Sequence, residues 1–128
     1  MIKVVEILPG EEPVIKDVES LHSYGRKLFD EPFMDHANVG NDLYIAVGDS
    51  SALMGKTVNF TISYGGAERT VCGAAVFVNR IFERGGGETY DEYKALLAGE
   101  AAAILDLFKR NRMTFHPDEL HRLLGWEL

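Results

Sequence analysis

Short hydrophobic segments separated by turn-forming residues recur along the first eighty positions, and one of them alternates strictly between hydrophobic and polar residues, a pattern typical of a strand with one buried face. The segment 57–64 shows this alternation, because every second residue is hydrophobic: Val58, Phe60, Ile62 and Tyr64. Further strands are predicted at 2–8, 14–18, 43–48 and 69–79. Turn-forming residues at 9–13 and 65–68 join neighbouring strands, so the pattern predicts two antiparallel hairpins.

A spacing of three and four between hydrophobic residues replaces the alternation from Ser20 onward. This spacing predicts a short helix that ends at Pro32, because proline cannot continue a helix. The next segment, 33–42, has no periodicity and is rich in turn-forming residues. We therefore expect it to be a loop.

Two further helices are predicted in the last third of the chain. Thr89 and Glu92 have the spacing of a capping box, and hydrophobic residues at threes and fours continue the helix to about Arg110. Pro117 suits the first turn of a second helix and Gly125 suits its exit. The predicted fold class is α+β: an antiparallel sheet of about five strands, followed by one long and one short C-terminal helix.

Length and composition favour a single domain spanning residues 1–128, since 46% hydrophobic and 26% charged residues exclude a disordered chain. The hydrophobic runs are too short to cross a bilayer, and the N-terminus does not have the pattern of a secretory signal. Cys72 is the sole cysteine, which is consistent with a reducing compartment. The chain is therefore predicted to be cytoplasmic, with no membrane partner.

A net charge of −7 repels the phosphates of nucleic acids, so direct DNA or RNA binding is not expected. An acidic protein of this size is suited instead to a basic partner surface. The four histidines are His22, His36, His116 and His121, and they have neither the i, i+4 spacing nor the cysteine partners of a zinc site. No metal and no cofactor are predicted.

The letters GKT at 55–57 match the end of a phosphate-binding loop, but their surroundings do not. Such a loop has four residues between its first glycine and the Gly-Lys pair, whereas six residues separate Gly48 from Gly55. A helix must also follow, and the segment 57–64 has strand periodicity instead. We therefore expect no phosphate loop here.

The letters GDSS at 48–51 are similar to the first block of GDSL esterases, and the later DELH is similar to their Asp-x-x-His block. The resemblance implies Ser50 as nucleophile, His121 as base, Asp118 as its orienting group and Asn41 as an oxyanion donor. That family has a larger, doubly wound parallel sheet, and its asparagine block follows the serine. Here Asn41 precedes Ser50, so an esterase is the least favoured function.

Arginine and aromatic residues together mark one candidate binding segment. RIFER at 80–84 places Arg80 and Arg84 on either side of Phe82. Guanidinium and aromatic groups recognise a base or a phosphate, although a solvated strand edge is the commoner role for such a pattern. With Asn59, these residues form the predicted ligand-binding set for a nucleotide-like anion, in a pocket between the protomers of a homo-oligomer.

Within about residues 1–80, several short stretches carry a family resemblance: IKVVEILPGEEP at the start, Leu21, DLYIAV, MGKTVN and CGAAVFV. They are similar to a family of small proteins of unknown function found in phages and mobile elements of Gram-positive gut bacteria. That family has a Gly-Leu-Pro-x-Asn word between two strands. Here Lys56 and Thr57 replace its Leu and Pro, while Gly55 and Asn59 remain. The resemblance implies that 48–59 is a structural connection, with Gly55 in a turn and Asn59 bonding to backbone.

The function favoured at this level is a non-enzymatic phage or mobile-element accessory protein. It would act by binding a host component, either a defence protein or the signal molecule of that protein. The alternative from a different class is a protein that binds or sequesters a nucleotide-like small molecule. The first hypothesis is defined by a host component, either a protein or its signal molecule, and the second by a pocket for a nucleotide-like anion.

Overall fold

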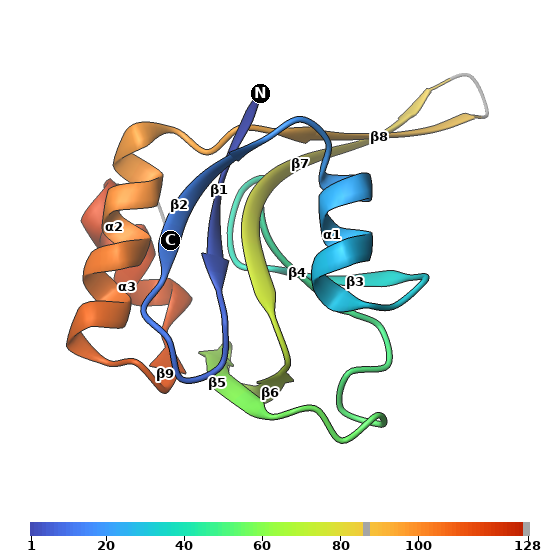
Figure 1. The fold of residues 1–128 in the computed structure, drawn as a ribbon. Coiled ribbons are helices and arrows are strands. Elements are labelled where there is room, and N and C mark those ends of the chain that lie inside the picture. The colour runs from blue at the N-terminus through green and yellow to red at the C-terminus, as the bar shows by residue number, and fades with distance from the viewer. Residues whose placement is uncertain (86–87, 127–128) are drawn as a thin grey trace.

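The computed structural model describes residues 1–85 and 88–126, with backbone alone for 82–85 and 88–91. Its main element is a six-stranded sheet in which all neighbouring strands are antiparallel. The path runs β2-β1-β7-β4-β3, and β8 pairs with the far part of β7 (Figure 1). The bounds are β1 Ile2–Ile7, β2 Val14–Val18, β3 Met34–Asn38, β4 Leu43–Gly48, β7 Ala75–Gly85 and β8 Glu88–Lys94.

A second, three-stranded sheet has the order β6-β5-β9. Its strands are β5 Val58–Tyr64, β6 Ala67–Cys72 and the short β9 Thr114–Phe115. β5 and β6 form the antiparallel hairpin predicted from the alternation, whereas β9 joins β5 in parallel. The chain thus brings a strand from its C-terminal part back beside its middle.

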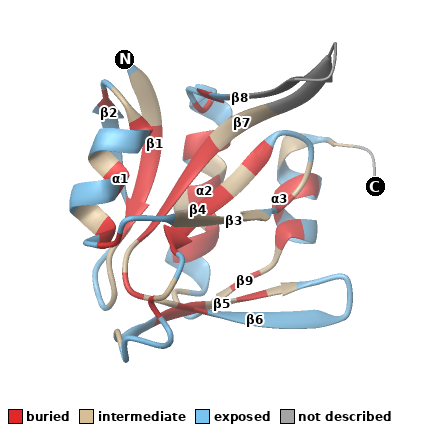
Figure 2. Ribbon diagram, turned by 90° about the vertical axis from the view of Figure 1, so that its right-hand side faces the viewer, coloured by how far each residue is buried: buried red, intermediate tan, exposed pale blue. Residues whose placement is uncertain are grey.

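Helices cover both faces of the six-stranded sheet (Figures 1 and 2). α1, Leu21–Phe29, packs on one face, and its Tyr24 hydroxyl donates a hydrogen bond to Glu6 of β1. α2, Ala98–Arg110, and α3, Pro117–Leu124, pack on the other face together with the small sheet. The central strands are therefore buried on both sides.

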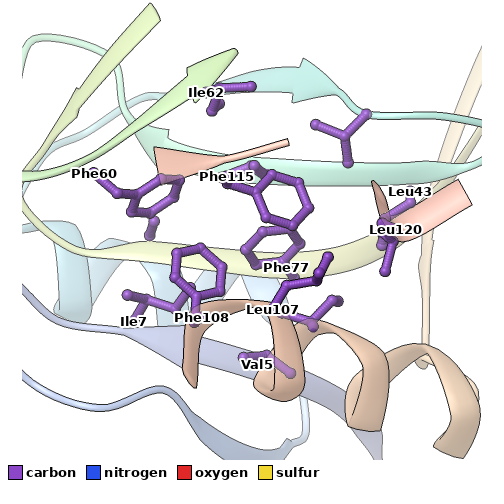
Figure 3. Close-up of a cluster of buried hydrophobic side chains, with 14 of the residues drawn as sticks. Val5, Ile7, Leu43, Phe60, Ile62, Phe77, Leu107, Phe108, Phe115 and Leu120 are labelled. Atoms are coloured by element: carbon purple, nitrogen blue, oxygen red, sulfur yellow. The ribbon is translucent and has the colours of Figure 1, made fainter. Parts of the chain in front are cut away.

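Four phenylalanines form the centre of the larger core (Figure 3). Phe108 of α2 stacks on Phe115 of β9 with ring centroids 5.4 Å apart, and Phe77 of β7 meets Phe115 edge-on at 5.0 Å. Phe60 of β5 meets Phe108 edge-on at 5.0 Å. Aromatic pairs at such distances stabilise a protein beyond the contribution of their buried area. These contacts therefore join α2, both sheets and β9 into one core.

The predicted fold class is confirmed, but the helix predicted from Thr89 is wrong. Residues 88–94 form β8, which pairs with β7, and α2 begins at Ala98. Glu100 accepts a hydrogen bond from the Leu97 N–H at 2.8 Å, so the capping residue lies eight positions after Glu92. The antiparallel pairing of 88–94 with the preceding strand β7 overrode the helical spacing.

The loop predicted at 33–42 is also wrong in part, because Met34–Asn38 forms the edge strand β3. Most of its side chains are half-buried, so the strand does not need one fully hydrophobic face. Its sequence therefore lacks the hydrophobic alternation that predicts a strand. The strand predicted at 69–79 is divided at Gly73, whose φ of +75° separates β6 from β7.

Helices α1 and α3 form as predicted, with differences only at their ends. α1 ends at Phe29, and the capping residue Asp30 has a left-handed φ of 52°, two residues before Pro32. α3 begins at Pro117 and ends at Leu124, and its capping residue Gly125 is also left-handed. These ends are local in sequence, and local signals predicted them well.

Candidate ligand-binding site

Five polar and aromatic side chains gather on the α1 side of the sheet: His22, His36, Tyr44, Arg80 and Tyr93. We call this set the histidine–tyrosine face. His22 comes from the first turn of α1, and the others come from the adjacent strands β3, β4, β7 and β8. Strand pairing sets their positions, since Arg80 lies opposite Tyr93 and Tyr44 lies opposite Val78.

Tyr93 lies at the centre of the face, between two imidazoles. Its hydroxyl is 2.6 Å from Nε2 of His36, and the two rings stack with centroids 5.7 Å apart. The His22 ring meets Tyr93 edge-on at 5.1 Å. Tyr93 is buried while His22 is exposed, so one imidazole of the pair is open to solvent.

Arg80 provides the positive charge of the face. Its guanidinium lies over the Tyr44 ring, 5.4 Å from the centroid, and its backbone N–H donates to Asp42 O at 2.8 Å. The Tyr44 ring in turn meets His36 edge-on at 6.3 Å. A half-buried guanidinium beside flat rings can hold an anion and stack a planar group against the same surface.

An ion pair flanks the face where β3 meets the β5–β6 hairpin. Arg69 donates to Asp35 at 2.6 Å, and the His36 backbone N–H donates to the other carboxylate oxygen at 2.9 Å. Burial by itself would raise the pKa of Asp35, but these hydrogen bonds and the neighbouring charges of Arg69 and His36 hold that pKa below its ordinary value. Asp35 is therefore a carboxylate near neutral pH, and Arg69 is already engaged.

The structure places the predicted ligand-binding residues in different regions. Arg80 belongs to the histidine–tyrosine face, and Phe82 and Arg84 follow it in β7, but the side chains of Phe82 and Arg84 lie outside the described residues. Asn59 is beside Gly73, before β7 begins. The part of β7 from Ala75 to Arg80 spans roughly 17 Å at about 3.3 Å per residue, and Asn59 lies beyond its start, so Asn59 and Arg80 do not share a site.

Asn59 makes the backbone hydrogen bonds that its place in the connection implied. Its amide nitrogen donates to Ile7 O and to Gly73 O, both at 2.9 Å. Its amide oxygen accepts from Arg112 at 2.7 Å, and the side chain is 1% exposed. Asn59 therefore ties β1, β5 and the segment after α2 together.

The esterase residues are not assembled. His121 is buried and its Nε2 is 2.7 Å from Val39 O, next to the β3–β4 turn that contains Asn41. Ser50 follows Gly48 at the opposite end of β4. The length of β4, roughly 17 Å at about 3.3 Å per residue, separates Ser50 from His121. Asp118 is exposed in the first turn of α3.

Lys56 of the GKT letters binds a buried carboxylate. Its ammonium donates to Glu31 at 2.8 Å and also to the carbonyl of Phe29. Burial by itself would raise the pKa of Glu31, but hydrogen bonds from Lys56, Ser51 and a backbone N–H, with the charge of Lys56, hold that pKa below its ordinary value. Lys56 thus neutralises a buried anion of the protein.

The sequence pattern predicts Arg80 as a binding residue but not the four rings around it. The helical spacing predicts Tyr93 in a helix, and the spacing of His22 and His36 indicates only that they do not form a zinc site. The pairing of β4 with β7 joins the β3–β4 and β7–β8 hairpins and so brings these residues together, and no local spacing in the sequence indicates that pairing. Among the described residues, no group of three or more His, Cys, Asp or Glu side chains is placed to hold a metal ion.

No protein family, curated protein or solved structure matches this chain. Within the part of the chain that the structure describes, no helix has the length and hydrophobicity needed to span a bilayer. Function must therefore be argued from the residues of the histidine–tyrosine face itself.

Proposed function

We propose that this protein binds a nucleotide-like anion at the histidine–tyrosine face and holds it without changing it chemically. The observation that carries the proposal is the Arg80 guanidinium over Tyr44, beside the stacked pair of His36 and Tyr93. A net charge of −7 disfavours anions at long range. A ligand anion must therefore gain its affinity from a local cation and from ring contacts, and this face supplies both.

Each part of the face has a role in this proposal. The Arg80 guanidinium is planar and has five donors, so it can contact a phosphate in addition to the protein groups around it. The exposed His22 imidazole, which meets the Tyr93 ring edge-on, adds a further hydrogen-bonding group to the face. The rings at the face offer a stacking surface for a base, a contact that contributes about 1–3 kcal/mol in proteins that bind single strands. None of these contacts requires a covalent step.

The biological setting that we propose is a phage or mobile-element accessory protein that sequesters a host signal molecule. The support for this setting is the sequence resemblance of residues 1–80, and the support for the ligand class is the chemistry of the face. A nucleotide-like host signal satisfies both, because it is small, anionic and planar at one end. Sequestration requires tight binding and no turnover.

Calorimetric titration with ADP, adenosine and inorganic phosphate tests the proposal. We expect ADP to bind more tightly than either part alone, because phosphate and base contact different groups. Arg80→Ala should weaken ADP binding by about 10-fold or more, since a charged hydrogen bond contributes about 1.5–3 kcal/mol. Arg80→Lys should recover only part of the loss because lysine lacks the planar fork.

Arg122→Ala is the matched control, because Arg122 is an exposed arginine on α3, which packs on the opposite face of the sheet. It should leave the affinity for ADP unchanged. Equal ADP affinity in the Arg80→Ala and wild-type proteins would show that the histidine–tyrosine face is not the binding site. Conversion of ADP during the titration would contradict the proposal that the protein is not an enzyme. Failure of all three ligands to bind would reject the ligand class.

A further inference from the structure

Three large hydrophobic side chains are exposed around the β4–β5 connection, outside the histidine–tyrosine face. The exposed fractions are 71% for Phe33, 92% for Leu53 and 57% for Met54. The Asp49 N–H donates to Phe33 O at 3.1 Å, so the segments 30–33 and 49–57 lie side by side. We call Phe33, Leu53 and Met54 the apolar tip; the connection that carries two of them extends below β3 and α1 in Figure 1.

The connection that carries Leu53 and Met54 is fixed from inside by Glu31. The Ser50 N–H and the Ser51 hydroxyl each donate to the Glu31 carboxylate at 2.6 Å, and Lys56 donates to it at 2.8 Å. The Glu31 side chain is 3% exposed. Both ends of the connection are therefore attached to one buried anion.

Backbone hydrogen bonds within the connection add to this attachment. Met54 N–H donates to Ser50 O at 2.9 Å, and Lys56 N–H donates to Ser51 O at 3.1 Å. Gly48 must lack a side chain, because a Cβ there would lie 1.9 Å from a Glu31 oxygen. The exposed side chains thus project from a backbone whose ordering is already complete, which lowers the entropy cost of binding.

The charges beside the tip indicate its partner. The exposed charged residues of segments 30–33 and 48–57 are Asp30 and Asp49, and both are acidic. Lys56 does not offset them, since its charge is engaged by Glu31. A second copy of this chain would bring like charges together in a protein whose net charge is −7.

We propose that the apolar tip is a docking surface for a partner protein that offers an apolar pocket with a basic rim. Leu53 and Met54 are flexible side chains that fill such a pocket, and Phe33 adds a flat contact at its edge. Asp30 and Asp49 pair with the basic rim and set orientation and association rate. This surface acts independently of anion binding at Arg80.

The test compares Leu53→Asp and Met54→Asp with the control Leu97→Asp. Leu97 is 69% exposed and precedes α2, where aspartate is a favourable cap. Quantitative capture from host lysate should find one protein that wild type and Leu97→Asp retain and that both tip variants lose by about 10-fold or more. The captured protein is then purified, and its direct affinity should fall in Asp49→Lys and with added salt.

Three results would overturn the proposal. Self-association that Leu53→Asp abolishes would make the occupant a second copy, and binding to phosphatidylcholine vesicles that Leu53→Asp abolishes would make it a membrane. Absence of any captured protein that depends on Leu53 would leave the tip without a partner. Thermal unfolding verifies that the tip variants fold, and ADP titration of Leu53→Asp distinguishes a failure here from a failure of the proposed function.

Discussion

Replacing Asn59 with alanine tests whether this buried amide stabilises the fold or contacts a ligand. The side chain is 1% exposed and makes hydrogen bonds to Ile7 O, Gly73 O and Arg112. Alanine removes all three and leaves two carbonyl groups and one guanidinium N–H without that partner. Alanine is also smaller, so the site gains an empty space rather than a new contact.

The expected cost follows from the groups left unpaired. A buried acceptor without a partner costs about 1–3 kcal/mol, and hydrogen bonds of charged groups contribute about 1.5–3 kcal/mol. Arg112 is half-buried and retains hydrogen bonds to Leu8 O and Glu11 O. Loss of its bond to Asn59 should therefore cost an amount near the lower limit of that range. We expect a loss of about 3–5 kcal/mol in the free energy of unfolding, which corresponds to roughly 10–20 °C in melting temperature.

Urea unfolding of Asn59→Ala measures this loss, with Asn38→Ala as the matched control. Asn38 also donates twice to backbone oxygens, to Asn41 at 2.9 Å and to Leu43 at 3.2 Å, but it is exposed. Water replaces its partners, so its loss should be about 1 kcal/mol. A double-mutant cycle with Arg112→Ala should give a coupling energy above about 1 kcal/mol.

Equal losses for Asn59→Ala and Asn38→Ala would refute the reasoning, because burial would then make no difference. A coupling energy near zero between Asn59 and Arg112 would show that their bond is not part of the effect. Unchanged stability together with weaker ADP binding would instead restore Asn59 to the ligand site, as the sequence predicted.

Two further substitutions test other buried contacts. Because the pKa of Glu31 is lowered on folding, its contribution to stability is present above the ordinary glutamate pKa and is lost as pH falls through the folded value. Glu31→Gln should therefore cost about 2–3 kcal/mol at pH 7, where Lys56 loses its partner, and the difference from wild type should shrink in urea titrations at progressively acidic pH. A constant difference at all pH values would contradict this. Gly40→Ala should cost about 2–4 kcal/mol, since φ is +124° and a Cβ would lie 2.2 Å from Nε2 of His121. Gly10 has a φ of +75°, but a Cβ there would have no atom within 4 Å. Thermal unfolding of Gly10→Ala should therefore show a loss of only about 1 kcal/mol in the free energy of unfolding.

For strand β5, the local sequence pattern predicts the strand but not the burial of every side chain in it. The alternation at 57–64 predicted a strand, and the structure has it at Val58–Tyr64. The same alternation puts Asn59 on the face opposite Phe60, yet both are buried. The register shifts between Val58 and Phe60, so Asn59 lies at a bulge-like irregularity of the β5–β6 pairing. A bulge depends on the partner strand, so the sequence of β5 alone does not contain it.

The sequence by itself determined the elements whose signals are local. Strand β5 followed from alternation, and α3 followed from Pro117 at its start and Gly125 at its exit, because periodicity and capping involve neighbours only. The tertiary structure decided everything that depends on pairing between distant segments. It brought His36 of β3 to Tyr93 of β8, 57 positions later in the chain, beside Arg80, which lies opposite Tyr93 in the β7–β8 hairpin. Such contacts are decided by the free energy of the whole sheet and core, which no single segment encodes.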